Sequence, residues 1–149
     1  MPNSARLRAG RFSETQRIYL LNATTENRET LFSNFTVGRI VVTELKAAQQ
    51  DGLAKSLAWV LMPDHLHWLI ALQQGSLSGL MRRIKGRSAK RINALVGRQG
   101  KLWQDGFHDR ALRREEDILP AARYIVANPL RAGLVNRVGD YPLWDSVWL

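Results

Sequence analysis

The sequence predicts an α+β fold, an antiparallel β-sheet of about four to five strands with helices packed against it. Two short apolar segments, 58–62 and 65–72, flank a break at Pro63-Asp64, a pattern typical of a β-hairpin. Two longer segments, 29–50 and 77–96, repeat apolar residues at intervals of three and four, as amphipathic helices do. With the flanking segments, the elements follow the order β-α-β-β-α-β-α, which agrees with this fold class.

The N-terminal part of this pattern contains one strand and one helix. Residues 17–24 (RIYLLNAT) form an apolar segment of strand length. A helix is predicted over Glu29–Gln50, and Asp51-Gly52 is expected to end it. Its inward positions are expected to be Leu31, Phe35, Val41 or Val42, Leu45 and Ala48.

The hairpin is followed by a second helix and a further strand. The helix is predicted over 77–96, and Gly97 and Gly100 are expected to end it. Its inward positions are expected to be Leu77, Leu80, Met81, Ile84, Ile92 and Leu95. After a tight turn at Asp105-Gly106, residues 107–112 are predicted to form the last strand.

The C-terminal part is predicted to form a helix and an aromatic tail. Three acids at 115–117 suit the start of a helix, where the dipole favours negative charge. The helix is expected to end near Asn128, because Pro129 disfavours helical geometry in the residue before it. The tail, 138–149, is expected to pack back across the sheet.

Length and composition suggest one domain over 17–149, preceded by a basic, flexible arm over 1–16. The arm either touches a phosphate backbone or is simply a frayed end. We expect no membrane contact, since no run resembles a membrane span or a signal peptide. The sequence has no cysteine, which excludes disulfides, thiolate metal sites and cysteine nucleophiles, and fits a reducing cytoplasm.

The charge balance points to a polyanionic partner. Lys and Arg number 22 against 13 Asp and Glu, a net charge of +9, which favours nucleic acid over a surface that is basic only for solubility. The helix over 77–96 contains no acid, although such a run can also be a solvated face. The candidate phosphate contacts are Arg82, Arg83, Lys85, Arg87, Lys90, Arg91, Arg110, Arg113 and Arg114.

Two histidines, His65 and His67, begin the second strand of the hairpin. Because side chains alternate along a strand, both imidazoles point to one face and form half of a divalent-metal site. His-x-His is a short pattern, and one structural histidine beside one exposed histidine is the alternative. Asp64 either orients an imidazole or only belongs to the turn, and we favour the turn. The lone Trp103 is expected in the core rather than stacked on a base, and His108 is expected to be structural.

Three segments together resemble a known family: HLH on a strand, LWQDGFHDRALR, and YIVANPLRAGLV at a helix end. In this order and spacing they resemble the REP-associated tyrosine transposases, a branch of the single-tyrosine transposases within the HUH (histidine, hydrophobic, histidine) nuclease superfamily. The resemblance covers roughly 17–149 and implies a ferredoxin-like HUH sheet with helices against it.

The resemblance also implies roles for individual residues. His65 and His67 would hold a divalent metal, Mg²⁺ or Mn²⁺, and Tyr124 would be the nucleophile. Many relatives in the wider family place a third ligand, often glutamine, four residues after the nucleophile, where this chain has Asn128. From the residues alone, Tyr124 would be an ordinary boundary tyrosine and Asn128 a C-terminal helix cap.

The implied activity is cleavage and rejoining of single-stranded DNA at palindromic REP hairpins through a 5′-phosphotyrosine. The first alternative is a catalytically silent DNA-hairpin-binding protein; the second is a metal-dependent RNA or phosphoester hydrolase that uses water. A monomer and a homodimer both fit the sequence. A bacterial, nucleoid-associated location in the cytoplasm is expected.

Overall fold

The computed structural model describes residues 17–113 and 115–148, so the predicted arm over 1–16 lies outside the described residues. The described strands form a five-stranded antiparallel sheet in the order β4-β1-β3-β2-β5. The strands are β1 (Ile18–Thr24), β2 (Ala54–Met62), β3 (His65–Leu72), β4 (His108–Leu112) and β5 (Trp144–Ser146). The helices are α2 (Phe35–Gln50), α3 (Leu77–Val96), α4 (Glu115–Val126) and the short α5 (Asn128–Arg131).

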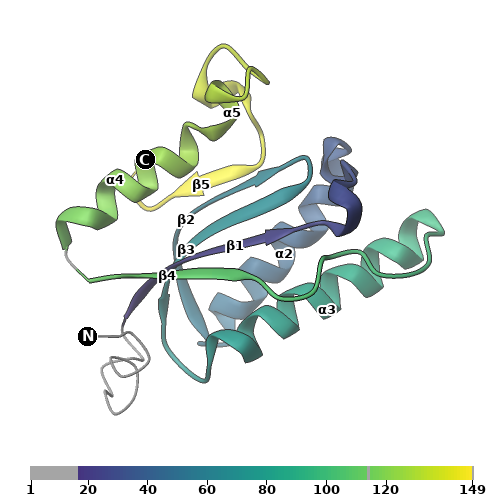
Figure 1. Ribbon diagram of the computed structural model, residues 1–149, viewed down its shortest axis with the longest axis horizontal. Helices are drawn as coiled ribbons and strands as arrows, with labels where there is room; N and C mark the ends of the chain where they lie inside the picture. The colour runs from purple at the N-terminus through teal and green to yellow at the C-terminus, as the bar shows by residue number, and fades with distance from the viewer. Residues whose placement is uncertain (1–16, 114, 149) are drawn as a thin grey trace.

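The helices cover the sheet in two separate layers. Figure 1 shows α2 and α3 on one face and α4 on the other, with α5 continuing from the end of α4. The first four strands have the order β4-β1-β3-β2, which is the ferredoxin-like arrangement, and β5 extends it at the β2 edge. The predicted α+β antiparallel fold is therefore confirmed.

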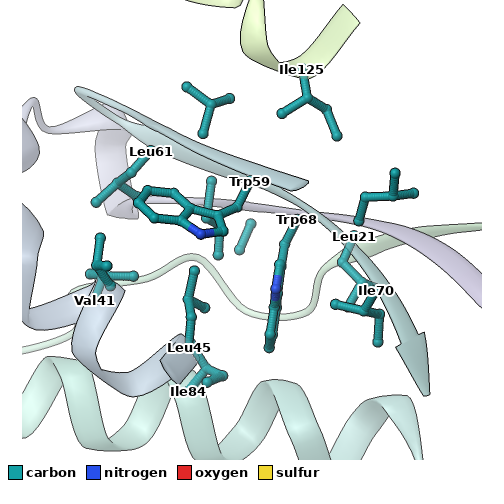
Figure 2. Packing of buried hydrophobic residues seen from close by; sticks show 14 of the residues in the cluster. Leu21, Val41, Leu45, Trp59, Leu61, Trp68, Ile70, Ile84 and Ile125 are labelled. Carbon is teal, nitrogen blue, oxygen red and sulfur yellow. The ribbon is translucent and has the colours of Figure 1, made fainter. Parts of the chain in front are cut away.

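Side chains alternate along the central strand β3, so successive residues face the two helical layers in turn. Leu66 and Trp68 are buried, at 1% and 0% exposure, on the face that packs against α2 and α3. Figure 2 shows Leu45 of α2 and Ile84 of α3 on that side of the strands, with Ile125 of α4 on the opposite side. Trp68 also donates from Nε1 to Ser56 Oγ at 2.8 Å, which satisfies its buried polar atom.

The hairpin and the basic helix lie where the sequence predicts them. The predicted strand over 58–62 is longer by four residues, as β2 begins at Ala54, and α3 covers 77–96 without change. The Ser76 side chain caps the start of α3, and Gly97 ends it in the left-handed conformation (φ 70°), which glycine adopts without strain. No helix among the described residues is long and apolar enough to cross a membrane.

The predicted start of the first helix at Glu29 is wrong. Two 3₁₀ turns, Glu26–Arg28 and Leu31–Ser33, occupy this stretch, and α2 begins only at Phe35. Asn34 sets the boundary, because its Oδ1 accepts from the free amides of Thr36 (3.0 Å) and Val37 (3.3 Å).

Two predicted inward side chains are exposed. Phe35 is the first residue of α2 and is 42% exposed, and Leu95, next to last in α3, is 58% exposed. Both lie at helix ends, beyond the part of the helix that the sheet covers. Trp103 is buried as predicted, at 3% exposure, and its Nε1 donates to Ser88 Oγ at 3.0 Å.

The aromatic tail extends the sheet at its edge instead of packing across a face. Trp144–Ser146 pairs antiparallel with β2, and Tyr141 is buried beside it. The Tyr141 hydroxyl donates to the Leu61 carbonyl at 2.6 Å, and the Leu61 amide donates to the Leu143 carbonyl at 2.9 Å. These bonds attach the tail to β2.

The helix before the tail ends two residues earlier than predicted. α4 stops at Val126, and Asn128 begins α5 instead of leaving helical geometry. Pro129 is tolerated there because the first amides of a helix need no intrahelical partner. The Ala127 amide still bonds to the Arg123 carbonyl at 3.1 Å, so the chain passes from α4 to α5 with only a slight break.

Tyr141→Phe is predicted to lower the free energy of unfolding by about 1 kcal/mol at pH 7, because a buried hydrogen bond is lost. Burial raises the pKa of Tyr141 to about 12, from 10.0 for the free side chain. Above pH 10 only the unfolded state ionises, so wild-type stability falls as pH rises towards 12. Urea unfolding at both pH values measures this effect: the difference in free energy of unfolding between wild type and Tyr141→Phe should be about 1 kcal/mol at pH 7 and about zero at pH 11.

Tyr19→Phe is the matched control for this experiment. The Tyr19 hydroxyl is buried without a hydrogen-bond partner among the described residues, so its removal should cost nothing. An equal difference between wild type and Tyr141→Phe at both pH values would contradict the assignment of the alkaline loss to Tyr141.

Candidate functional site

The two histidines of β3 lie side by side on the face of the sheet that α4 covers. His65 and His67 alternate with Leu66 and Trp68, which face the opposite layer. Their ring centroids are 4.7 Å apart and the ring planes are almost perpendicular, at 87°. Both side chains are only partly buried, so this pair is accessible from the α4 side.

Each histidine uses Nδ1 for a hydrogen bond to a neighbouring oxygen. His65 Nδ1 lies 2.7 Å from Asp64 Oδ1, and His67 Nδ1 donates to Asn22 Oδ1 on the adjacent strand β1. With the proton on Nδ1, each ring keeps its lone pair on Nε2, the arrangement found in histidines that bind metals. Asp64 lies in the turn as predicted, yet it also orients an imidazole.

A cation and an unusual backbone support Asp64. Arg28 Nε donates to Asp64 Oδ2 at 3.1 Å. Asn27 and Arg28 both adopt left-handed φ angles, 57° and 53°, which cost energy in residues other than glycine and often occur at functional sites. Burial raises the pKa of Asp64, but the hydrogen bond and charge of His65, together with Arg28, bring this pKa below its ordinary value.

The electrostatics keep His67 neutral. Burial, the charge of His65 and the charge of Arg131 lower the pKa of His67 from 6.5 to about 4. Its Nε2 lone pair is therefore unprotonated at neutral pH, as a metal ligand requires.

Tyr124 is the exposed tyrosine of the chain, and it lies on the same side of the sheet as the histidines. The sequence has 3 tyrosines: Tyr19 and Tyr141 are 0% and 4% exposed, whereas Tyr124 is 58% exposed. It projects from α4 and lines a groove of about 780 Å³ together with Asn22 and His108.

The pairing of the strands places this groove next to the histidine pair. His108 pairs with Asn22, and Asn22 pairs with His67, so the three side chains share one face of neighbouring strands. His108, which was expected to be structural, is exposed and lines the groove. Its position at the first residue of an edge strand explains why no core packing reaches it.

Asn128 and Tyr124 are connected through one arginine. Arg131 Nη2 donates to Asn128 Oδ1 at 2.9 Å and to the Tyr124 carbonyl at 2.8 Å. Its guanidinium also lies over the Tyr124 ring, 3.8 Å from the centroid. Asn128 Nδ2 is buried without a hydrogen-bond partner among the described residues.

The donors at this site fit a divalent metal only as an open set of two imidazole nitrogens and one amide oxygen. The described residues contain no group of three or more His, Cys, Asp and Glu side chains that could hold an ion. The two imidazole rings lie side by side with centroids 4.7 Å apart, and the Asn128 amide oxygen, which accepts from Arg131, would be the third donor. Such a set leaves positions open for water and phosphate oxygens, which suits Mg²⁺ or Mn²⁺.

Most of the predicted phosphate contacts lie on α3, which is on the opposite face of the sheet from the histidines (Figure 1). Several of these side chains have partners within the protein. Lys85 bonds to the Gln104 and Gly106 carbonyls, Arg83 pairs with Asp51, and Arg87 and Arg91 pair with Glu44. Arg82 and Lys90 are exposed and have no ionic partner within 17–113 and 115–148.

The remaining predicted phosphate contacts follow the groove. Arg110 is exposed and lines the groove beside His108. Arg113 is exposed just after β4, and Arg114 lies outside the described residues. Arg110 and the histidines therefore share one face, whereas Arg82 and Lys90 belong to a separate surface.

Asn22 and Arg131 contact the candidate site residues but are not predicted from the sequence. Asn22 has no local signal, because its contact with His67 depends on which strands pair. Arg131 does have one, since it follows Tyr124 by seven residues and Asn128 by three, the spacing of one helical face.

Comparison with known proteins identifies related families and structures. The family model described as "Transposase IS200 like" matches residues 15–128. A REP-associated tyrosine transposase from Escherichia coli (strain K12) is 33% identical over 87 residues, which cover 57% of this chain. A relative from Haemophilus influenzae is 25% identical over 99 residues, which cover 59% of this chain. The matched segments span 50% and 56% of those two proteins, about half the length of each relative.

A solved structure supports the fold. A REP-associated tyrosine transposase bound to a REP hairpin superposes with a TM-score of 0.72 and 24% identity, covering 87% of this chain and 76% of that one. A second solved structure, from Deinococcus radiodurans R1, has a TM-score of 0.54 and 23% identity, covering 72% of this chain and 87% of that one. At these identities the likeness establishes the α+β architecture.

The site geometry predicts an acid-shifted titration for His67 in metal-free protein. Its imidazole should remain neutral until the pH falls to about 4, and Arg131→Gln should move this pKa upward, because one of its three causes is removed. Two-dimensional ¹H–¹³C NMR of the imidazole groups in the presence of EDTA measures both values. A wild-type midpoint near 6.5 would contradict the buried, cation-flanked environment.

Proposed function

The chain belongs to the IS200-like transposase family, and we propose that it is a metal-dependent enzyme that cleaves and rejoins single-stranded DNA beside palindromic hairpins. One observation carries this proposal: the exposed tyrosine and the paired histidines lie on the same face of the sheet. A phosphodiester on that face can therefore meet a nucleophile and a metal-binding pair together.

Tyr124 is proposed as the nucleophile. Its phenolic oxygen forms a bond to the scissile phosphorus and the bond from phosphorus to the 3′ oxygen breaks; the phenolic proton passes to solvent, and the leaving 3′ oxygen takes up a proton from solvent. The products are a 5′-phosphotyrosine and a free 3′-hydroxyl. Attack by a 3′-hydroxyl reverses these steps and rejoins strands without ATP, because the phosphotyrosine retains the energy of the broken ester.

His65 and His67, with Asn128, are proposed to hold the cation. When bound, Mg²⁺ or Mn²⁺ would polarise the phosphate oxygens and offset negative charge in the transition state. Asp64 and Asn22 hold the imidazoles through Nδ1, so that the two Nε2 atoms are presented in fixed orientations.

The DNA partner is proposed to be a hairpin with single-stranded flanks. A structural relative is bound to a REP hairpin, and the charge of +9 suits any folded polyanion. Arg110 lies in the groove beside Tyr124 and is assigned to phosphates close to the cleaved bond. Arg82 and Lys90, on the opposite layer, are assigned to phosphates of the hairpin away from the site.

Tyr124→Phe is predicted to abolish a covalent protein–DNA adduct. Wild type is incubated with Mn²⁺ and labelled single-stranded hairpin oligonucleotides, and the adduct is measured on denaturing gels. The matched control is Tyr141→Phe, which makes the same change at a buried tyrosine and should retain the adduct. Hairpin binding without any wild-type adduct would favour a silent hairpin-binding protein. Cleavage that persists in Tyr124→Phe would favour a hydrolase that uses water.

Asp64→Ala is predicted to weaken Mn²⁺ binding about 10- to 100-fold, because His65 loses the acceptor that fixes its tautomer and orientation. Isothermal titration calorimetry with Mn²⁺ measures the affinity directly, without DNA. Asp105→Ala is the matched control, since that carboxylate is exposed and pairs with Lys101 instead of a histidine. Equal affinities for wild type and Asp64→Ala would contradict the assigned role.

A further inference from the structure

Arg131 makes more contacts with the proposed catalytic groups than any role as a helix cap requires. Its guanidinium stacks on the Tyr124 ring at 3.8 Å and donates to the Tyr124 carbonyl and to Asn128 Oδ1. One cation thus contacts both the proposed nucleophile and the proposed amide ligand.

The guanidinium retains donors that are not used by the protein. Both hydrogen bonds come from Nη2, and neither Nε nor Nη1 has an acceptor among the described residues. The Arg131 side chain is exposed, so an anion can reach these nitrogens. A planar fork of N–H groups with free positions matches the non-bridging oxygens of a phosphate.

The position of these donors matters for the reaction. A phosphate attacked by Tyr124 must approach the phenol closely, at about 3–3.5 Å between the reacting atoms. Because the guanidinium lies against the same ring, the non-bridging oxygens of that phosphate come within reach of Nε and Nη1. Negative charge builds on these oxygens in the transition state, where a fixed cation stabilises it most.

We propose that Arg131 is a catalytic residue that binds the non-bridging oxygens of the scissile phosphate. This inference rests on the proposed cleavage by Tyr124 and adds a protein cation to it. Arg131 stays protonated throughout and only donates hydrogen bonds. The phenolic oxygen still forms the new bond to phosphorus and the bond to the 3′ oxygen breaks; the phenolic proton goes to solvent, and the leaving 3′ oxygen takes a proton from solvent.

A purely positioning role makes a different prediction. If Arg131 served only to hold the Tyr124 ring and backbone, its loss would slow attack on every substrate equally. If it binds the charged phosphate, its loss matters only when the phosphate carries that charge. A methylphosphonate at the cleaved position, in which a methyl group replaces one charged oxygen, separates the two roles.

The experiment compares wild type and Arg131→Gln on two hairpin oligonucleotides that differ only at this position. On the phosphodiester, we expect adduct formation to be slower in Arg131→Gln by about 10²- to 10³-fold. On the methylphosphonate, both proteins should react at the same rate within a factor of about three. Arg131→Lys, which keeps the charge without the fork, should regain part of the phosphodiester rate.

Arg123→Gln is the matched control, because Arg123 is exposed on α4 next to the nucleophile and its side chain makes no contact with the site within the described residues. It should match wild type on both substrates, and thermal melting checks that all variants are folded. Equal losses for Arg131→Gln on both substrates, or no loss on either, would overturn the role of Arg131. A wild type that forms no adduct on the phosphodiester would overturn the proposed cleavage itself.

Discussion

The site depends on the alternation of side chains along β3. Leu66 and Trp68 are buried against α2 and α3, and this burial fixes the register of the strand. His65 and His67 must then face α4, the layer that also carries Tyr124. A slip of one residue would bury both imidazoles in the core, so the same hydrophobic contacts that stabilise the fold also orient the chemistry.

The electrostatics of this face suit an anionic substrate. Asp64, the carboxylate that contacts His65, is also bound by Arg28, which offsets its negative charge. His67 is held neutral by burial and by neighbouring positive charge, including that of Arg131. The protein therefore presents the neutral His67 imidazole and the Arg131 cation on this face, where Asp109 and Asp117 also line the groove, and a bound divalent ion would make the potential more positive.

The sequence predicts those elements whose bounds depend on residues close together in the chain. The hairpin and α3 follow from apolar period and from breaks at Pro63-Asp64 and Gly97, all of which are visible in the sequence. The start of α2 was missed because Asn34 captures two amides, whereas the apolar period continues backwards through residues that form 3₁₀ turns. The edge strand β5 has three residues, too few for a period, and exists only because β2 offers it a partner.

The candidate site divides in the same way: His65, His67 and Tyr124 can be found from sequence, but their convergence on one face is a property of the folded sheet. The most direct test is a crystal structure of the protein with Mn²⁺ and a hairpin oligonucleotide, using the anomalous signal to locate the ion. We predict an ion at about 2.0–2.2 Å from both Nε2 atoms and about 4–5 Å from the Tyr124 hydroxyl, so that one phosphate bridges them. An ion bound elsewhere, or a hydroxyl more than about 10 Å from it with DNA bound, would contradict the account.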